Sequence, residues 1–473
     1  MAAAGLAIRS EGRFAFAARG RIRCLSTGQD VETDQFYRID DRQIAQAFSS
    51  AMPGYLADLV DVAMAVYFAD RLLSRRPAGT NRSQPHWSRH TELSVPVRDP
   101  ERWNDADLRT QLEALLWLFT EDEWVLSFVR RPGDPRSAEA QVHLFPEPPR
   151  RPVTTALFSG GLDSLAGLGR ELTTRPNDTF VLVSAYTNSR LGHLQRRLIR
   201  ELRDRYQHRI LSVAVPFAFR PGGTHHPEQE RTQRSRGFVY MALGAVTALM
   251  AGIDVLTIYE NGVGAINLPY TEAQLGTQNT RAVHPFALAK MAGFVQAATG
   301  HLFRFENPFL FSTNGQMCSF LCEPGLSDLV ARTASCDGYP LRDHEHLQCG
   351  ACTSCLLRRS SLYQVGSAHL DPAEHYAFDV LRFGWRLPEP RLRPLRAMSD
   401  QVRRIRTALA EPDAWRALSF LFPQLLEVAL TYESLGKPQG EAEHQLLCLY
   451  RTYCLEWRQF ETALPHSPAN RAA

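Results

Sequence analysis

Between about residues 150 and 305 of the chain, short apolar runs alternate with longer amphipathic segments. Uninterrupted apolar runs of this kind are typical of strands buried on both faces, and apolar residues every three to four positions indicate helices. Alternation of the two predicts βαβ units with right-handed crossovers, and therefore an α/β fold with a doubly wound parallel sheet. The predicted strands span residues 153–158, 180–186, 210–216, 254–259 and 302–305, and the predicted helices span 165–172, 191–206, 237–251 and 286–298.

The pattern changes on both sides of this central region, which we place at residues 151–375. Residues 31–150 combine one helical stretch with segments of alternating polarity, which predicts an α+β domain. Residues 376–473 carry apolar positions at helical spacing and predict a helical region. The helical stretches are 44–73, 399–409, 414–434 and 441–464, and the alternating segments are 92–97, 123–128 and 141–145.

Two further segments separate these regions. The run 146–152 holds four prolines and predicts a linker, since proline can continue neither a helix nor a central strand. Residues 1–30 are rich in alanine and arginine and predict a flexible tail, although a transit peptide has a similar composition.

The composition is that of an ordinary water-soluble globular chain. Of its 473 residues, 44% are hydrophobic and 22% are charged, and the formal net charge is +3. So small a charge gives no reason to expect direct nucleic-acid binding. No segment approaches the roughly 18 apolar residues that a membrane span requires. We therefore expect a cytoplasmic protein without a membrane partner; a homo-oligomer is compatible with the sequence.

The most specific motif follows the first central strand and reads Ser159-Gly-Gly-Leu-Asp-Ser164. Two glycines permit a tight turn and a close backbone approach to a ligand. Free N–H groups at the start of the following helix, together with the helix dipole, favour an anion there. Asp163 can hold Mg²⁺ or cap the helix.

This hexapeptide resembles the PP-loop of the N-type ATP pyrophosphatases, which belong to the HUP type of α/β fold. The resemblance implies that ATP is cleaved between its α and β phosphates, giving AMP and pyrophosphate. The nucleotide-binding residues that it implies are Ser159, Gly160, Gly161, Leu162, Asp163 and Ser164, with Ala185 and Tyr186 beside the adenine.

A second motif consists of four cysteines among residues 336–355. Cys336, Cys349, Cys352 and Cys355 offer four thiolates, the number that a structural zinc site requires, with no position left open for catalysis. Such clustering suits a metal in a reducing compartment better than a disulfide framework. The spacing therefore predicts a zinc knuckle.

The two motifs together resemble the 7-cyano-7-deazaguanine synthase (QueC) family over about residues 153–365. Ser335-Cys336 and the run from Cys349 to Arg358 are similar to the zinc segment of that family. The resemblance implies that ATP adenylates the carboxylate of 7-carboxy-7-deazaguanine, that ammonia then gives the amide, and that a second ATP gives the nitrile. The expected cofactors are ATP, Mg²⁺ and Zn²⁺.

The chain also departs from those synthases. It carries Thr313-Asn314 where they have a threonine–lysine pair, and a Glu-Asn-Gly segment from residue 260 where they have Tyr-Pro-Asp-Cys. The additional N- and C-terminal regions resemble QueC-like proteins of anti-phage defence operons. In that branch the implied chemistry ends with transfer of the activated acyl group to an amine on a protein encoded nearby.

Single residues receive roles from their position after predicted strands. Asp163, Ser164 and Arg236 are the catalytic candidates, since Arg236 precedes the helix predicted over 237–251, at the edge of the sheet where phosphate would lie, although it could equally be a surface arginine. Glu260 and Asn261 could read a purine edge, or could form a turn that merely ends the strand. Asn267 and Tyr270 are the remaining candidates for contact with the substrate.

The leading hypothesis is an enzyme that activates a deazapurine carboxylate and joins it to an amine. Three alternatives remain: a nitrile-forming synthase, a tRNA-modifying PP-loop enzyme, and a nucleotide-gated binding module. The neutral Asn314 favours the module, and the intact motif at residues 159–164 opposes it.

Overall fold

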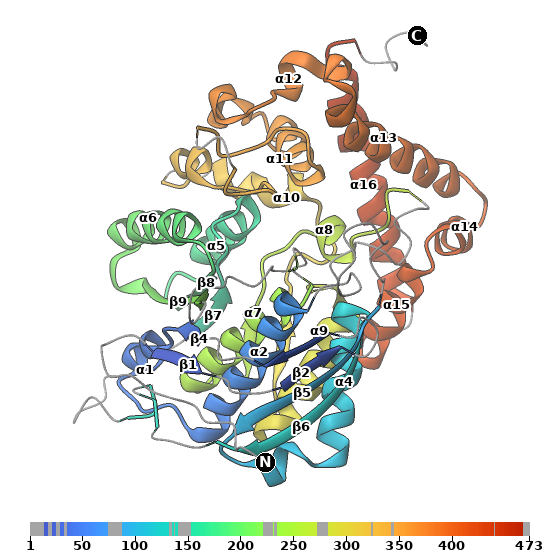
Figure 1. The fold of residues 1–473 in the computed structure, drawn as a ribbon. Coiled ribbons are helices and arrows are strands. Elements are labelled where there is room, and N and C mark those ends of the chain that lie inside the picture. The colour runs from blue at the N-terminus through green and yellow to red at the C-terminus, as the bar shows by residue number, and fades with distance from the viewer. Residues whose placement is uncertain are drawn as a thin grey trace.

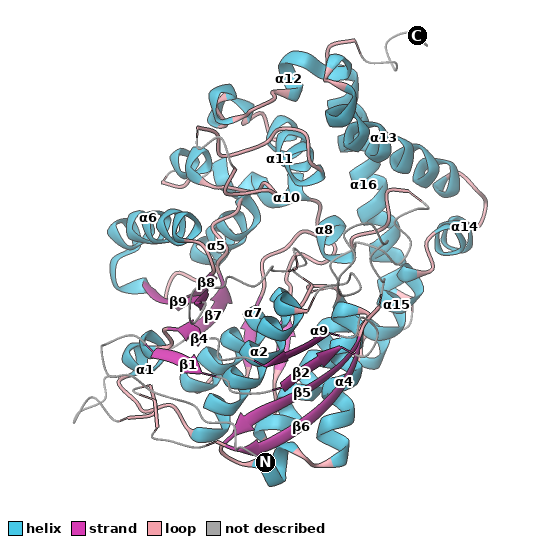
Figure 2. Cartoon of the chain, viewed as in Figure 1, coloured by secondary structure: helices cyan, strands magenta, loops and turns pink. Residues whose placement is uncertain are grey.

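The computed structural model shows strands in two groups, with a large helical region beside them (Figures 1 and 2). It describes residues 14–17, 21–24, 29–32, 36–73, 88–131, 135–136, 138–140, 153–220, 230, 234–271, 282–322, 325–341, 345–438 and 440–466.

Seven strands form the larger sheet, in the order β1-β4-β9-β8-β7-β10-β11. From β9 to β11 all neighbours are parallel, as predicted. The chain runs outward through β7, β8 and β9, then returns to the other side of β7 for β10 and β11, so the strand order reverses between β7 and β10. Ligands of open α/β sheets bind at such a reversal. The bounds are β7 Val153–Leu157, β8 Thr179–Tyr186, β9 Ile210–Arg220, β10 Val255–Thr257 and β11 Arg304–Glu306.

Helices cover both faces of this sheet. On one face, α5 (Leu162–Thr174) and α6 (Ser189–Tyr206) share an apolar core with segments 309–330. On the other face, α7 (Arg236–Met250) and α9 (Pro285–Thr299) lie in a second core. The doubly wound arrangement expected from the alternating pattern is therefore present, with helix ends within three residues of their predicted positions.

The region 1–30 was predicted to be a flexible tail, and the structure corrects this. It contains the strands β1, β2 and β3, and β4 follows directly. Because β9 continues beyond Pro216 to Arg220, its final residues have an edge that β4 occupies in antiparallel fashion, and β1 then pairs with β4. The bounds are β1 Phe14–Ala17, β2 Arg21–Cys24, β3 Gln29–Glu32 and β4 Phe36–Ile39.

The smaller sheet has the order β3-β2-β5-β6. Its strands β5 (His90–Val97) and β6 (Glu123–Arg130) are parallel and are joined by α3 (Pro100–Trp103) and α4 (Ala106–Thr120). Side chains cover the outer edge of β6: the N–H of Leu126 donates to Glu113 at 3.0 Å, and Asn104 bonds both backbone groups of Phe128. An edge satisfied in this way is closed to a further strand.

The boundary predicted near residue 150 does not separate two cores. Residues of α1 (Arg42–Phe48), α2 (Gly54–Leu72), β5 and β6 belong to the same apolar core as α7 and α9. The helix predicted over 44–73 is two helices: the first ends at Phe48, where Ser49 takes the left-handed conformation, and Pro53 immediately precedes the second. The predicted strand 141–145 and linker 146–152 lie outside the described residues.

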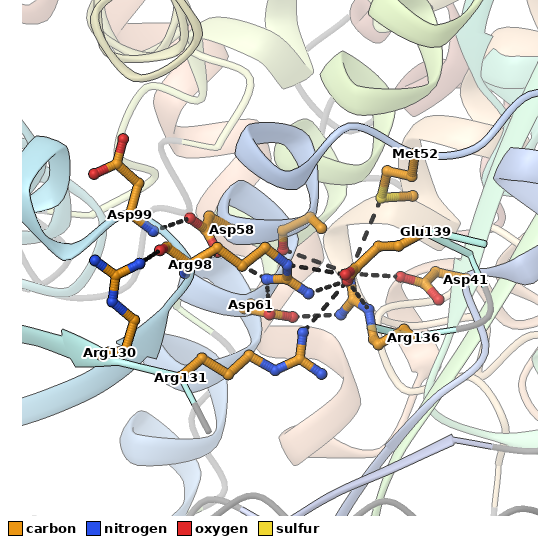
Figure 3. A network of polar contacts seen from close by, with 11 residues as sticks. Asp41, Met52, Asp58, Asp61, Arg98, Asp99, Arg130, Arg131, Arg136 and Glu139 are labelled. Atoms are coloured by element: carbon orange, nitrogen blue, oxygen red, sulfur yellow. Dashed lines mark hydrogen bonds and ion pairs between the residues drawn. The ribbon is translucent and has the colours of Figure 1, made fainter. Parts of the chain in front are cut away.

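A network of buried charges ties this region together (Figure 3). Arg136 forms ion pairs with Asp41, at 3.0 Å, and with Asp61, and Arg98 contacts Asp58 and Asp61 at 2.7 Å each. Both arginines also pair with Glu139. The network thus joins α2, the ends of β4 and β5, and the short segment around residue 136.

The C-terminal region is helical, as predicted, and its apolar core also includes Val263, Ile266 and Leu356 of the central region. Pro423 divides the predicted helix 414–434, and the first long helix begins ten residues earlier than predicted, with Pro390 in its first turn. No helix in the described part of the chain has both the length and the apolar character needed to cross a bilayer. The bounds are α12 Val380–Phe383, α13 Glu389–Leu409, α14 Ala414–Leu421, α15 Gln424–Ser434 and α16 Glu441–Ala463.

We predict that Arg136→Met lowers the free energy of unfolding by about 3–5 kcal/mol, because it leaves Asp41 and Asp61 buried without this cation. Arg393→Met, at an exposed position of α13, should change it by less than about 0.5 kcal/mol. Urea unfolding of the three proteins measures the difference. Equal unfolding midpoints for the two variants would show that the buried network does not stabilise the fold.

Candidate functional site

The glycine loop, residues 159–164, connects the end of β7 to the start of α5 at the point where the strand order reverses. Its hydroxyl groups bond within the loop: the N–H of Gly161 donates to Ser159 Oγ at 3.2 Å, and Ser164 Oγ donates to the carbonyl of Gly161 at 2.9 Å. The loop therefore presents the N-terminal amides of a thirteen-residue helix at the edge of the sheet.

The surroundings of the loop require a glycine at position 160. Gly160 has φ +83°, and a Cβ there would lie 2.7 Å from Leu194 Cδ2 on α6. Position 161 is less constrained: its backbone is extended, and a Cβ there would lie 3.3 Å from Ser159 Oγ and 3.5 Å from the carbonyl oxygen of Ala334.

Asp163, in the first turn of α5, is held by two neutral amides. Its Oδ2 accepts from Asn261 Nδ2 at 2.7 Å and from the backbone N–H of Asn261 at 3.2 Å. Its Oδ1 accepts from Asn314 Nδ2 at 2.6 Å, and Asn314 Oδ1 in turn accepts from the thiol of Cys318. Two segments that are distant in the sequence therefore orient one carboxylate.

Asn261 begins the short helix α8 (Gly262–Ile266), which follows β10. Its Oδ1 accepts from the N–H of Gly264 at 2.9 Å, while its Nδ2 bonds Asp163 and lies 3.3 Å from Glu260 Oε1. Because both polar side-chain atoms are engaged within the protein, the structure favours a positioning role for Asn261 over the predicted contact with a purine.

Glu260 lies next to Asp163 and has an unusual protonation equilibrium. Burial, followed by repulsion from the Asp163 carboxylate, raises the pKa of Glu260 well above its ordinary value. The backbone carbonyl of Glu260 accepts from Asn307 Nδ2 at 2.8 Å, which fixes the end of β10. Glu260 therefore retains its proton to a higher pH than an ordinary glutamate does.

The other predicted contacts with the substrate lie further along the chain. Asn267 ends α8 in the left-handed conformation, with φ +50°. Tyr270 packs against the core of the C-terminal helices, and burial raises the pKa of its phenol. Its hydroxyl contacts Thr353, beside Cys352. Tyr270 thus connects the segment after α8 to the cysteine motif.

Within the described part of the chain, no hydrogen bond or ion pair joins the remaining predicted residues to the glycine loop. Arg236 lies over the ring of Tyr240, on its own helix α7, at 5.7 Å. Tyr186, at the end of β8, accepts at its hydroxyl from Arg196 Nη1 at 2.6 Å and packs on Gly192 of α6. Ala185 and Tyr186 remain at the edge of the sheet where the glycine loop lies, but Arg236 has no demonstrated catalytic contact.

The four cysteines converge as their spacing predicts. The sulfur atoms of Cys336, Cys349, Cys352 and Cys355 all lie within 4.8 Å of one another. The Sγ–Sγ distances are 3.9 Å between Cys349 and Cys355 and 4.0 Å between Cys336 and Cys352. A tetrahedral site with Zn–S bonds of about 2.3 Å requires about 3.8 Å, so this cysteine cluster is compatible with zinc.

The sequence analysis gave no role to three residues that lie at the site. Asn314 is the second side chain that donates to Asp163, Ser335 contacts the glycine loop, and Glu456 of α16 accepts from Thr313 at 2.7 Å. Of these three, Asn314 follows a local signal, because Thr313-x-x-Gln316 is a capping box and α10 (Asn314–Cys318) begins there. Comparison with protein-family models and with curated proteins returned no match for this chain.

We predict that purified protein takes up one Co²⁺ per chain at the cysteine cluster, with the thiolate-to-metal charge-transfer absorption of a tetrathiolate site. Cys352→Ser should lose most of this absorption, and Cys448→Ser, an exposed cysteine of α16, should retain it. An optical titration measures both. Full absorption in Cys352→Ser would contradict the assignment of the cysteine cluster as a metal site.

We predict that Glu260→Gln stabilises the protein increasingly as the pH rises. The native pKa lies above that of the unfolded chain, about 4.3, so the folded protein binds more protons in that interval and wild-type stability falls with rising pH. The glutamine variant avoids this loss, which amounts to at most about 1.4 kcal/mol per pH unit.

Urea unfolding from about pH 4 to about pH 8 measures this difference. Glu411→Gln, at an exposed position, serves as the matched control and should follow the wild type. A constant difference between Glu260→Gln and the wild type at all pH values would contradict the raised pKa.

Proposed function

We propose that this chain is an AMP- and pyrophosphate-forming ligase that activates a carboxylate with ATP and transfers the acyl group to an amine. The observation that carries the proposal is the glycine loop at the reversal of strand order, with Asp163 held beside it by Asn261 and Asn314. The resemblance of residues 159–164 and of the cysteine motif to the 7-cyano-7-deazaguanine synthases supports the choice of reaction.

The loop fits the pyrophosphate part of a nucleotide. An anion at this position would meet backbone N–H groups at the N-terminus of α5, where the helix dipole favours negative charge. The hydroxyls of Ser159 and Ser164 lie 3.3 Å apart in the same loop, where they would add hydrogen-bond donors to such an anion. Asp163 Oδ1 accepts one hydrogen bond, from Asn314, so this oxygen is the one that would hold Mg²⁺; that ion would supply positive charge to the phosphates.

The proposed substrate is a deazapurine carboxylate, as in 7-carboxy-7-deazaguanine. One oxygen of its carboxylate attacks the α-phosphorus of ATP, and the bond from that phosphorus to pyrophosphate breaks. The nitrogen of an amine then attacks the acyl carbon and loses a proton, and AMP leaves. Glu260 is the residue best placed to contact the base, because its carboxyl lies at the end of β10 beside Asp163.

In this proposal the amine belongs to a partner protein encoded nearby. Zinc occupies the cysteine cluster. Four thiolates at tetrahedral spacing fill the coordination shell of Zn²⁺, so the metal would be structural. Asn314, in place of the lysine of the synthases, leaves Asp163 without a cationic partner at that position. A changed charge beside the activated carboxylate is consistent with an acyl acceptor other than ammonia.

We predict that the zinc-loaded protein, given ATP, Mg²⁺ and 7-carboxy-7-deazaguanine, releases AMP and pyrophosphate. Asp163→Ala should reduce the rate at least about 100-fold with an unchanged far-ultraviolet dichroism spectrum, because charge stabilisation at the phosphates is lost. Asp204→Asn, at an exposed position of α6, is the control and should retain the rate. ADP as the product would exclude the proposed cleavage.

The fate of the acyl group separates the alternatives. Mass spectrometry that finds the deazapurine acyl group on a partner protein supports ligation. A free nitrile would identify a synthase, and modification of tRNA would identify the RNA-directed class. ATP binding without turnover in the presence of all three reactants would identify a nucleotide-gated binding module.

A further inference from the structure

The cysteine cluster and the glycine loop are joined by two hydrogen bonds. The N–H of Ala334 donates to the carbonyl of Gly160 at 3.1 Å, and the N–H of Leu162 donates to Ser335 Oγ at 3.2 Å. Cys336 is the next residue of the chain. A metal held by Cys336 therefore restrains the segment that contacts the loop on both sides of Gly161.

The hydroxyl of Ser335 retains its own proton for an incoming acceptor. Ser335 Oγ receives the N–H of Leu162 and lies 3.4 Å from Arg358 Nη1, so nitrogen donors occupy its two lone-pair directions. A Cβ built on Gly161 would lie 3.9 Å from Ser335 Oγ and 3.3 Å from Ser159 Oγ. The carbonyl oxygen of Ala334 lies 3.5 Å from the same point, so the two hydroxyls and this carbonyl line the side of Gly161 that carries no side chain.

Arg358 fixes the position of Ser335 from behind. It is buried, and its guanidinium bonds Asp371 and Thr333 at 2.8 Å and 2.6 Å. It belongs to α11 (Thr353–Gln364), which follows Cys352 directly and carries Cys355 in its first turn. The cysteine cluster therefore restrains Ser335 twice, through Cys336 in the same segment and through the helix that carries Arg358.

We propose that Ser335 is a phosphate-binding residue supplied to the glycine loop by the metal-holding segment, so that zinc and nucleotide each strengthen the binding of the other. This inference rests on the proposed function, since it requires a nucleotide phosphate at the loop. The Ser335 hydroxyl donates to a phosphate oxygen that the amides of α5 also bind. Order imposed by the metal on residues 334–336 is then already present when the nucleotide arrives.

The first experiment measures nucleotide binding to the full chain loaded with zinc. Calorimetric titration with ATP and Mg²⁺ should show Ser335→Ala binding about ten-fold or more weakly than the wild type, because a hydrogen bond to a charged group is lost. Ser335→Thr keeps the hydroxyl and should restore most of the affinity. Ser354→Ala is the matched control. Ser354 lies between two of the cysteines, and its hydroxyl donates to the exposed Asp337 at 2.6 Å rather than to the glycine loop.

The second experiment measures the reciprocal effect on the metal. Competition with a chelator should show a tighter apparent Kd for zinc when ATP is present, and by thermodynamic linkage zinc should improve ATP affinity by the same factor. Ser335→Ala should still bind one zinc, but the effect of ATP on zinc affinity should shrink towards none. A role confined to folding would lower zinc affinity equally with and without ATP.

The possible failures are distinguishable. Equal ATP affinity of Ser335→Ala and the wild type, or a zinc affinity that does not respond to ATP, overturns this inference and leaves the proposed function standing. A zinc-loaded wild type that binds no ATP overturns the proposed function, and this inference with it.

Discussion

The carboxylate of Asp163 is oriented by two neutral amides, and the rest of the site is arranged around that interaction. Asn261 and Asn314 fix both oxygens of Asp163 without cancelling its charge. The uncompensated charge also acts on Glu260, whose pKa it raises further after burial has done so. A site built in this way keeps negative charge beside the glycine loop, where a divalent cation would be attracted.

The amides themselves are positioned by the C-terminal helices. Thr313, which begins the short helix containing Asn314, donates to Glu456 of α16 at 2.7 Å. Burial raises the pKa of Glu456 to about 7, although the Thr313 hydroxyl opposes the shift. Near the start of α8, the N–H of Gly262 donates to the carbonyl of Ser312, and a Cβ on Gly262 would lie 2.8 Å from Leu449 Cδ2 of α16. The helical region is therefore part of the site rather than an appendage.

The sequence predicted those features of the fold and the site that depend on local patterns of residues. The five parallel strands and the cysteine cluster follow from apolar runs and from spacing, so both were placed correctly. β1 and β4 were missed because they depend on the extra length of β9, a partner more than 170 residues away. The contact between Asn261 and Asp163 was not predicted for the same reason: the two residues are distant in the sequence, and an Asn-Gly pair carries no sign of that contact.

The source of affinity for phosphate follows from the charges around the loop. In the described part of the chain, Arg358 is the cation connected to the loop through the fewest hydrogen bonds, by way of Ser335. Asp371 forms an ion pair with Arg358. Under the proposed function, backbone amides, hydroxyls and the dipole of α5 would therefore hold the phosphates, with Mg²⁺ supplying the missing cation. Backbone groups keep their geometry when side chains change, so such a loop could bind phosphate with asparagine rather than lysine at position 314. Affinity would then depend on the segments that hold the loop in place, the one beginning with Ala334 above all.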